Sequence, residues 1–288
     1  MPPAESSSPP SAAPAAPPAV LRGPLAYSGI VSQLRSAGCV FAEEEARLLL
    51  AEASGPGQLA DNVRRRVQGE PLEYILGWAE FAGLRIAVEP GVFVPRRRTE
   101  LLVNEAVALL TADPVPPAPT VVDLCSGSGA VGAAILRRLP GVELHATDID
   151  PAAVACARRN VALLGGRVHV GDLFRALPPG LHGQVQLLAV NAPYVPTDAI
   201  RTMPPEARLH EPAASLDGGP DGLDFHRRLA AEASEWLAPG GYLLIETSGR
   251  QAAATAAILA AAGFGVRTVR SEDLDGTAVV GTIKRAGR

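Results

Sequence analysis

The stretch VVDLCSGSG, residues 121–129, decides the fold of this chain. Its apolar start is typical of a buried strand, and its glycines let the backbone turn sharply into a helix. Helix amide groups at such a turn face a bound ligand, which the glycines allow to approach closely. With Gly132 the turn spells G-x-G-x-x-G, a pattern that fits NAD, FAD or S-adenosylmethionine.

The residues on both sides of this turn alternate between apolar runs and helical patterns. Helical segments over 130–139 and 151–164 separate the first three runs, and Asp150-Pro151 supplies a capping carboxylate and a first-turn proline. Such alternation indicates a parallel sheet with helices on both faces. We therefore predict an α/β, Rossmann-like domain over residues 99–288. Its strands are expected at 120–124, 142–147, 167–171, 185–191, 241–247, 264–270 and 278–284.

Three shorter parts precede this domain. Residues 1–22 are rich in proline, alanine and serine and are predicted to be a disordered tail. Residues 23–70 are predicted to form a small helical domain, because apolar residues recur there at helical spacing. Residues 71–98 are expected to be a hairpin linker that turns at Ala82-Gly83. The helices are expected at 26–37, 42–54 and 58–68, and the hairpin strands at 78–81 and 84–88.

Composition and charge exclude several classes of protein. The formal net charge is −4, so no overall positive field draws the chain to nucleic acid. The three cysteines form no C-x-x-C pair and the histidines show no ligand spacing, which predicts reduced thiols, a cytoplasmic location and no metal site. No apolar run reaches the roughly 18 residues of a membrane span. The local run Arg64-Arg65-Arg66 is expected on a solvated helix face.

Acidic residues at three strand ends indicate which of the three possible cofactors, NAD, FAD or S-adenosylmethionine, the glycine turn binds. Asp123 ends the first strand, where its charge suits a cationic aminoacyl ligand and repels a pyrophosphate. Asp148 closes the second strand, in position to accept hydrogen bonds from both hydroxyls of a ribose. Asp172 and Leu173 follow the third strand, where they could hold an adenine. S-adenosylmethionine carries an ammonium, a ribose and an adenine, and is the predicted cofactor.

Asn191-Ala192-Pro193-Tyr194 follows the fourth strand and resembles the N-P-P-Y motif of methyltransferases that act on planar nitrogens. An amide nitrogen is a poor nucleophile because its lone pair is delocalised into the carbonyl. A site can help by accepting both N–H hydrogens, one on the Asn191 side-chain oxygen and one on the Ala192 carbonyl. Tyr194 can pack on the amide plane and exclude water. The motif therefore predicts methyl transfer in which the enzyme acts mainly by positioning the amide nitrogen.

The order and spacing of six pieces of sequence resemble the HemK/PrmC family of protein-glutamine methyltransferases, from about residue 70 to the C-terminus. The pieces are EPLEYILGWAEFAG (70–83), VFVPRRRTELLV (92–103), DLCSGSGAVG (123–132), NAPYVP (191–196), LDGGPDGLDFHRRL (216–229) and LAPGGYLLIE (237–246). The resemblance implies a seven-stranded methyltransferase sheet and a helical domain that grips the protein substrate. The expected partner is a protein that carries the target glutamine, such as a release factor or a ribosomal protein, and the chain itself is expected to be a monomer.

The resemblance also implies roles for individual residues. The cofactor-binding set is Asp123, Cys125, Ser126, Gly127, Ser128, Gly129, Asp148, Asp172, Leu173 and Asn191. The catalytic set is Asn191, Ala192, Pro193 and Tyr194. The substrate entrance is expected at Phe93, Pro95, Arg96 and Thr99.

Two positions depart from the family pattern. Ala192 stands where proline is usual, as in a branch of the family that carries N-x-P-Y and has no assigned substrate. The carbonyl acceptor is kept, but the turn is less rigid. Arg97 and Arg98 stand where the commoner pattern has a proline and an acidic residue, which places positive charge near the entrance. These departures leave open whether the substrate is the Gly-Gly-Gln loop of peptide-chain release factors.

Two other hypotheses stay open on the residues alone. The N-P-P-Y type of motif also serves exocyclic amino groups, so an adenine-N6 methyltransferase of DNA or RNA is an alternative, although the acidic balance argues against it. A catalytically silent adaptor that binds the cofactor and docks on translation factors is the other. A dehydrogenase is disfavoured because no set of hydride-transfer residues is visible.

Overall fold

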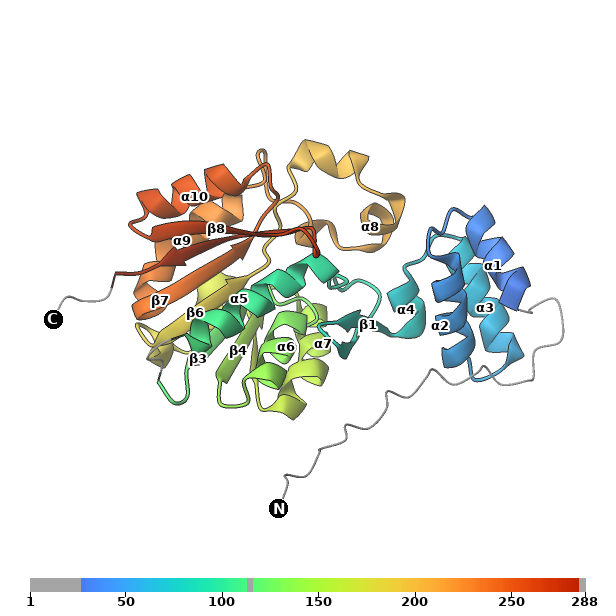
Figure 1. Cartoon of the computed structure of the whole chain (residues 1–288), viewed down its shortest axis with the longest axis horizontal. Coiled ribbons are helices and arrows are strands. Elements are labelled where there is room, and N and C mark those ends of the chain that lie inside the picture. The colour runs from blue at the N-terminus through green and yellow to red at the C-terminus, as the bar shows by residue number, and fades with distance from the viewer. Residues whose placement is uncertain (1–26, 113–115, 285–288) are drawn as a thin grey trace, which may run out of the picture. The chain divides into compact units, whose positions relative to one another are not determined.

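The computed structural model describes residues 27–112 and 116–284, so the tail expected over residues 1–22 lies outside the described part. The backbone contacts divide the chain into two units, with the division between Gly69 and Glu70 (Figure 1). No helix within the described ranges is long and apolar enough to cross a membrane.

The first unit consists of three helices whose apolar faces form a small core. Arg66 follows the buried residues Leu59 and Val63 at helical spacing, so its side chain faces this core. Its guanidinium donates two hydrogen bonds to buried Glu45, at 2.6 and 3.1 Å. The expectation of a fully solvated arginine face is therefore wrong at Arg66, where an inward charge needs a buried partner. The helices are α1 (Tyr27–Ser36), α2 (Ala42–Glu52) and α3 (Pro56–Val67).

The hairpin expected within residues 71–98 packs into the second unit. Ala82 and Gly83 have φ angles of 52° and 76°, the two left-handed residues that a tight hairpin turn requires. Asn160, far along the chain, exchanges two hydrogen bonds of 2.9 Å with the backbone of Ala87 and so holds the second hairpin strand. The elements here are α4 (Leu72–Leu76), β1 (Trp78–Phe81) and β2 (Leu84–Ala87), followed by a 3-10 turn at Arg97–Thr99.

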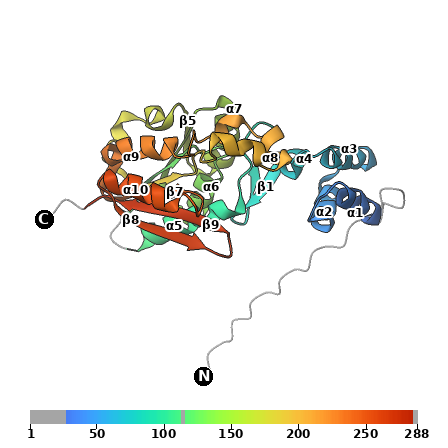
Figure 2. The same ribbon diagram turned by 90° about the horizontal axis from the view of Figure 1, so that it is seen from above.

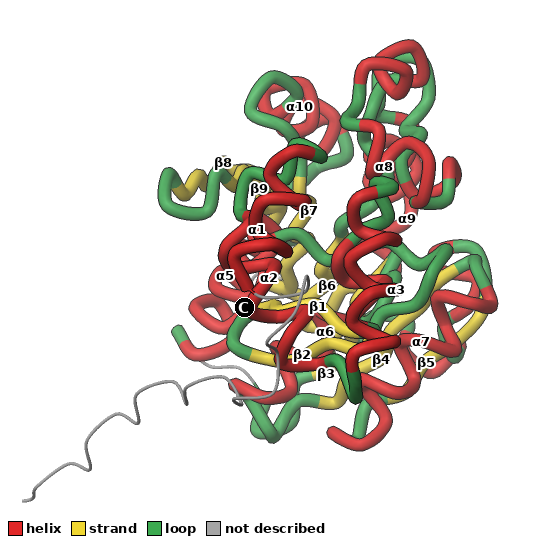
Figure 3. The backbone as a smooth tube through the Cα atoms, turned by 90° about the vertical axis from the view of Figure 1, so that its right-hand side faces the viewer, coloured by secondary structure: helices red, strands yellow, loops and turns green. Residues whose placement is uncertain are grey.

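A seven-stranded sheet in the order β5-β4-β3-β6-β7-β9-β8 forms the centre of the second unit (Figure 3). Strands β3 to β7 are parallel to one another, and β9 is antiparallel to both β7 and β8. This confirms the predicted α/β, Rossmann-like sheet. The strands are β3 (Thr120–Leu124), β4 (Glu143–Asp148), β5 (Arg167–Val170), β6 (Val185–Val190), β7 (Leu237–Glu246), β8 (Gly265–Ser271) and β9 (Gly276–Thr282).

Helices cover both faces of this sheet (Figure 2). Side chains alternate along β3, so that Val121 packs with α5 and α6, whereas Val122 and Leu124 pack with α9 and α10. The helices are α5 (Glu100–Thr111), α6 (Ala130–Arg138), α7 (Pro151–Val161), α8 (Pro205–His210), α9 (Asp224–Trp236) and α10 (Ala252–Ala261). Short 3-10 turns lie at Ala162–Leu164, Leu173–Ala176, Pro179–Leu181, Thr197–Thr202 and Ala213–Ser215.

Candidate active site

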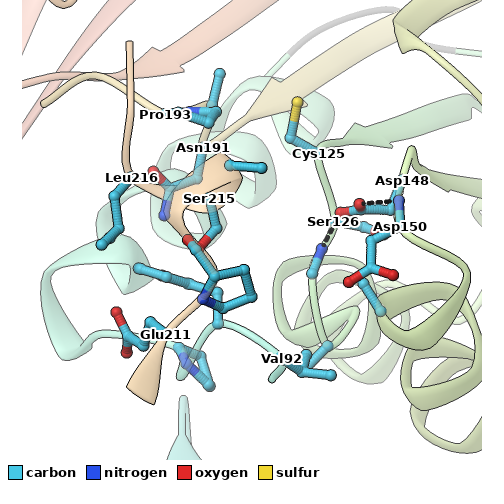
Figure 4. Close-up of a pocket in the computed structure, with 18 of the residues that line it drawn as sticks. Val92, Cys125, Ser126, Asp148, Asp150, Asn191, Pro193, Glu211, Ser215 and Leu216 are labelled. Atoms are coloured by element: carbon cyan, nitrogen blue, oxygen red, sulfur yellow. Dashed lines mark hydrogen bonds between the residues drawn. The ribbon is translucent and has the colours of Figure 1, made fainter. Parts of the chain in front are cut away.

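A cavity of about 730 Å³ opens at the carboxyl ends of β3, β4, β5 and β6. Doubly wound folds bind their ligands at this edge of the sheet. In Figure 4, Cys125, Ser126 and Asp148 lie on one side of the cavity, and Asn191 and Pro193 lie on the other. Of all the residues predicted for the cofactor, the acceptor and the entrance, only Gly129 does not line this cavity.

The glycine turn has the backbone conformation that its residue types favour. Cys125, Gly127 and Gly129 all have positive φ angles, of 56°, 54° and 75°. At Gly129 an added Cβ would come within 2.8 Å of Val161, so this glycine is needed for the packing of α7 against the turn. Gly127 instead lines the cavity, and its N–H donates to Asp148 Oδ2 at 2.8 Å. The turn therefore combines close helix packing with an exposed backbone.

Asp123 is a buried carboxyl in the wall of the cavity. It is 2% exposed, and its Oδ2 accepts a hydrogen bond of 2.8 Å from the Gly132 N–H. Burial raises the pKa of this carboxyl to about 7, and the neighbouring charge of Asp148 acts in the same direction. A cation that binds beside Asp123 would stabilise its charged form. The position therefore fits the ammonium of an aminoacyl ligand.

Asp148 is held by backbone donors but keeps acceptor capacity. Its Oδ2 accepts from Gly127, and its Oδ1 accepts from the Asp150 N–H at 3.0 Å. Each oxygen has a second lone pair, so the carboxylate can still accept both hydroxyls of a ribose. In the same wall, the hydroxyls of Ser126 and Thr147 are buried without a hydrogen-bond partner among the described residues. Orphaned hydroxyls of this kind fit a polar ligand.

Asp172 and Leu173 line the far end of the cavity. The Asp172 carboxylate is engaged by Arg228 of α9, whose guanidinium donates to its two oxygens at 2.8 and 2.6 Å. Sequence reasoning did not find Arg228. Leu173 is buried and has a φ of 48°, a strained conformation for leucine. Strain of this kind persists where the surrounding structure fixes a side chain at a functional position.

The acceptor motif lies across the cavity from the glycine turn (Figure 4). The Asn191 Nδ2 donates to Thr99 Oγ1 at 3.2 Å, which leaves the Asn191 Oδ1 for a ligand. The Tyr194 hydroxyl donates to Oε1 of Glu246 at 3.2 Å. Burial raises the pKa of Tyr194 to about 12, and the nearby carboxyl of Glu246 adds to the shift. Tyr194 is therefore a neutral hydroxyl at physiological pH.

The stretch LDGGPDG, residues 216–222, supports the backbone of the acceptor motif. An added Cβ at Gly218 would come within 2.8 Å of the Pro193 carbonyl oxygen, and one at Gly222 would overlap the Tyr194 carbonyl oxygen. Gln251 Nε2 donates to the same Tyr194 oxygen at 2.9 Å. These glycines allow the loop to lie directly against the motif.

The residues expected at the substrate entrance divide between surface and interior. Arg96 forms an ion pair with Glu211, whose side chain is 1% exposed. Arg98 Nε lies 3.6 Å from Oε1 of buried Glu246. Thr99 is 3% exposed and contacts Asn191 from behind. Two buried carboxylates therefore offset much of the positive charge expected here.

Comparisons with known proteins point to the same chemistry. Residues 83–219 match the family model of the methyltransferase small domain. A release factor glutamine methyltransferase of Geobacter sulfurreducens is 40% identical to this chain, over 70% of the chain and 69% of that protein. A 4-amino-L-phenylalanine/4-methylamino-L-phenylalanine methyltransferase of Streptomyces pristinaespiralis is also 40% identical, with the same coverage of 70% and 69%. The crystal structure of a methyltransferase from Pyrococcus furiosus has the same fold, with a TM-score of 0.52 at 16% identity over 70% of this chain and 90% of that one.

The sheet, the glycine turn and the carboxylates around the cavity, together with the methyltransferase family model and the 40% identical relatives, define an S-adenosylmethionine-dependent methyltransferase of the Rossmann-like class. This confirms the predicted enzyme class and cofactor. The chain belongs to the HemK/PrmC family of protein-glutamine methyltransferases, as its sequence pieces indicate.

Proposed function

We propose that this enzyme methylates the side-chain amide nitrogen of a glutamine in a protein, with a peptide-chain release factor as the first candidate substrate. The observation that carries the proposal is the orientation of Asn191. Its Nδ2 is held by Thr99, so the group left for a ligand is a hydrogen-bond acceptor. The release factor is chosen because relatives such as the Geobacter sulfurreducens protein are named for it.

Two acceptor oxygens match the two N–H groups of a primary amide. These are Oδ1 of Asn191 and the backbone oxygen of Ala192, and both residues line the cavity. Within the described part of the chain, no hydrogen bond uses either oxygen. An amide held by both hydrogens has its plane fixed, so the nitrogen lone pair above that plane takes one direction.

S-adenosylmethionine, when bound, supplies a methyl carbon made electrophilic by a sulfonium. Asp123, the glycine turn and Asp148 would hold it on the side of the cavity that faces Asn191. Tyr194 is neutral and is not required as a base for this step. Its hydroxyl is fixed by Glu246, and its ring can cover the substrate amide and exclude water. The methylated amide is strongly acidic while it is cationic, so its proton leaves without a dedicated base.

The test is transfer of methyl groups by the purified enzyme to three kinds of acceptor. These are a purified release factor, the free amino acid 4-amino-L-phenylalanine, for which one relative is named, and duplex DNA or RNA. We expect peptide mapping to place one methyl group on the glutamine of the Gly-Gly-Gln loop. Methyl groups only on the free amine or on nucleic acid would overturn the proposal.

Asn191→Ala is the matched variant for this test. It removes one of the two acceptors, so transfer should be abolished while the cofactor Kd stays within about threefold of the wild-type value. Loss of cofactor binding together with activity would show a general defect instead.

A further inference from the structure

Arg228 of α9 holds the carboxylate that follows β5. Its Nη2 donates to Oδ1 and Oδ2 of Asp172, at 2.8 and 2.6 Å, and both residues line the cavity. Leu173 and Leu229, which directly follow these two residues in the sequence, belong to the same buried apolar cluster. The packing of this cluster fixes α9 beside the end of β5, and so brings together two side chains that are 56 residues apart in the sequence.

The guanidinium of Arg228 also contacts an aromatic ring of its own helix. Its Cζ lies 5.7 Å from the centre of the Phe225 ring, within the range of a cation–π interaction. Phe225 lines the cavity as well, and it packs partly buried against the apolar cluster of Leu173 and Leu229. The guanidinium is therefore held both by a fixed ring and by the carboxylate.

The pair of Arg228 and Asp172 adds little to the stability of the fold. The side chain of Arg228 is 42% exposed and that of Asp172 is 31% exposed, so water screens the attraction between their charges. Ordering a long arginine side chain also costs conformational entropy. A pair that is ordered at the wall of a cavity, and that contributes little to folding, points to a role in binding the ligand of that cavity.

We propose that Arg228 is a positioning residue that, through Asp172, makes the cofactor site specific for a 6-aminopurine. One guanidinium nitrogen holds both oxygens of the carboxylate, so the plane of the carboxylate is fixed and its remaining lone pairs take set directions. An ionised carboxylate can only accept hydrogen bonds, which suits the amino group of adenine. The oxygen of a 6-oxopurine is itself an acceptor, and it is rejected by a carboxylate that cannot turn away.

The first test compares two cofactor analogues by calorimetric titration of the full chain. These are S-adenosylhomocysteine and S-inosylhomocysteine, whose purines carry an amino group and an oxygen at the same ring position. We expect the wild-type protein to bind the adenine compound at least about 30-fold more tightly. In Arg228→Met the Asp172 carboxylate can turn toward solvent, so the preference should fall to within about threefold. A preference that stays at the wild-type value in Arg228→Met would overturn the proposal.

Arg227→Met is the matched control. Arg227 precedes Arg228 in α9 and pairs with the exposed carboxylates of Asp221 and Asp224, but it does not line the cavity. Each variant removes one arginine from an exposed ion pair, so both proteins should unfold within about 2 °C of the wild type. The preference for adenine should change in Arg228→Met alone. An equal change in both variants would show a general effect of charge and would refute the proposed role.

A double-mutant cycle decides whether Arg228 acts through Asp172. Asp172→Ala removes the acceptor and should weaken the binding of S-adenosylhomocysteine about tenfold. Adding Arg228→Met to this variant should then change the Kd by less than about twofold, because the group that Arg228 positions is already absent. A further loss of affinity in the double variant would show that Arg228 contacts the cofactor itself, contrary to the proposal. These titrations contain no methyl acceptor, so their outcome is independent of whether the enzyme methylates glutamine.

Discussion

Burial raises the pKa of several carboxyl groups around the cavity. Asp123 and Asp148 lie at its cofactor side and Glu246 lies behind the acceptor motif, and in each case desolvation is the largest cause. A buried carboxyl becomes charged most readily when a cation or a hydrogen-bond donor faces it. The binding of the cofactor and the transfer of the methyl group are therefore both expected to depend on pH, through different carboxyl groups.

Cofactor affinity is expected to increase as the pH rises through 7. Below this value Asp123, whose pKa is about 7, is neutral and attracts the cofactor ammonium weakly. Above it the carboxylate attracts the ammonium, so the Kd near pH 6 should be about tenfold larger than the Kd near pH 8. Calorimetric titration across this range checks the expectation. Asp123→Asn should bind weakly with a flat profile, and a flat profile in the wild-type protein would contradict the assignment.

Most of the ionisable residues of the site were predicted because they stand at the carboxyl ends of predicted strands, where parallel strands meet at one edge of the sheet. Applied to the fifth predicted strand, within LAPGGYLLIE, the same rule would also have found Glu246. Arg228 and Thr99 could not be predicted in this way, because neither stands at the end of a strand. Their partners are 56 and 92 residues away, and which face of a helix or turn meets the end of the sheet depends on tertiary packing.

At the scale of elements, apolar runs bounded by glycines, prolines and acidic residues predicted the strands closely. β7 begins at Leu237 rather than at the predicted residue 241, because the Ala-Pro-Gly-Gly stretch still pairs with β6 across an irregular register. α10 was not predicted as a helix. Its sequence is almost entirely alanine, leucine and isoleucine, so it has no polar face to reveal a helical period.

The loop over residues 216–222 is expected to control activity through the backbone of Tyr194. In Gly222→Ala, the new Cβ overlaps the Tyr194 carbonyl oxygen, and the φ of 75° costs about 1 kcal/mol more for alanine. We expect kcat to fall at least about tenfold. The cofactor Kd should change little, because the glycine turn lies on the opposite side of the cavity.

Gly180→Ala is the control for the loop variant, since an added Cβ there meets nothing within 4 Å. Steady-state kinetics and cofactor titration of the two variants separate a local effect from general instability. Equal kcat values for both variants would show that the loop does not position the acceptor motif.

At the scale of the whole molecule, the cavity belongs to one unit. All its lining residues fall between Gly91 and Arg228, within the unit that begins at Glu70. The two large apolar clusters around the sheet also draw only on this unit. The three-helix unit has its own core with the buried pair of Arg66 and Glu45. Catalysis and recognition of the protein substrate can therefore be tested separately.

A chain that begins at Glu70 is expected to bind the cofactor with a Kd within about threefold of the full chain, because all the lining residues are kept. If the helical unit grips the protein substrate, its removal should raise KM for that substrate and leave kcat nearly unchanged. A short glutamine peptide is the control, since its kcat/KM should be the same with both chains. An unchanged KM for the protein substrate would show that the second unit, which carries Arg96 at the entrance, recognises this substrate without the helical unit.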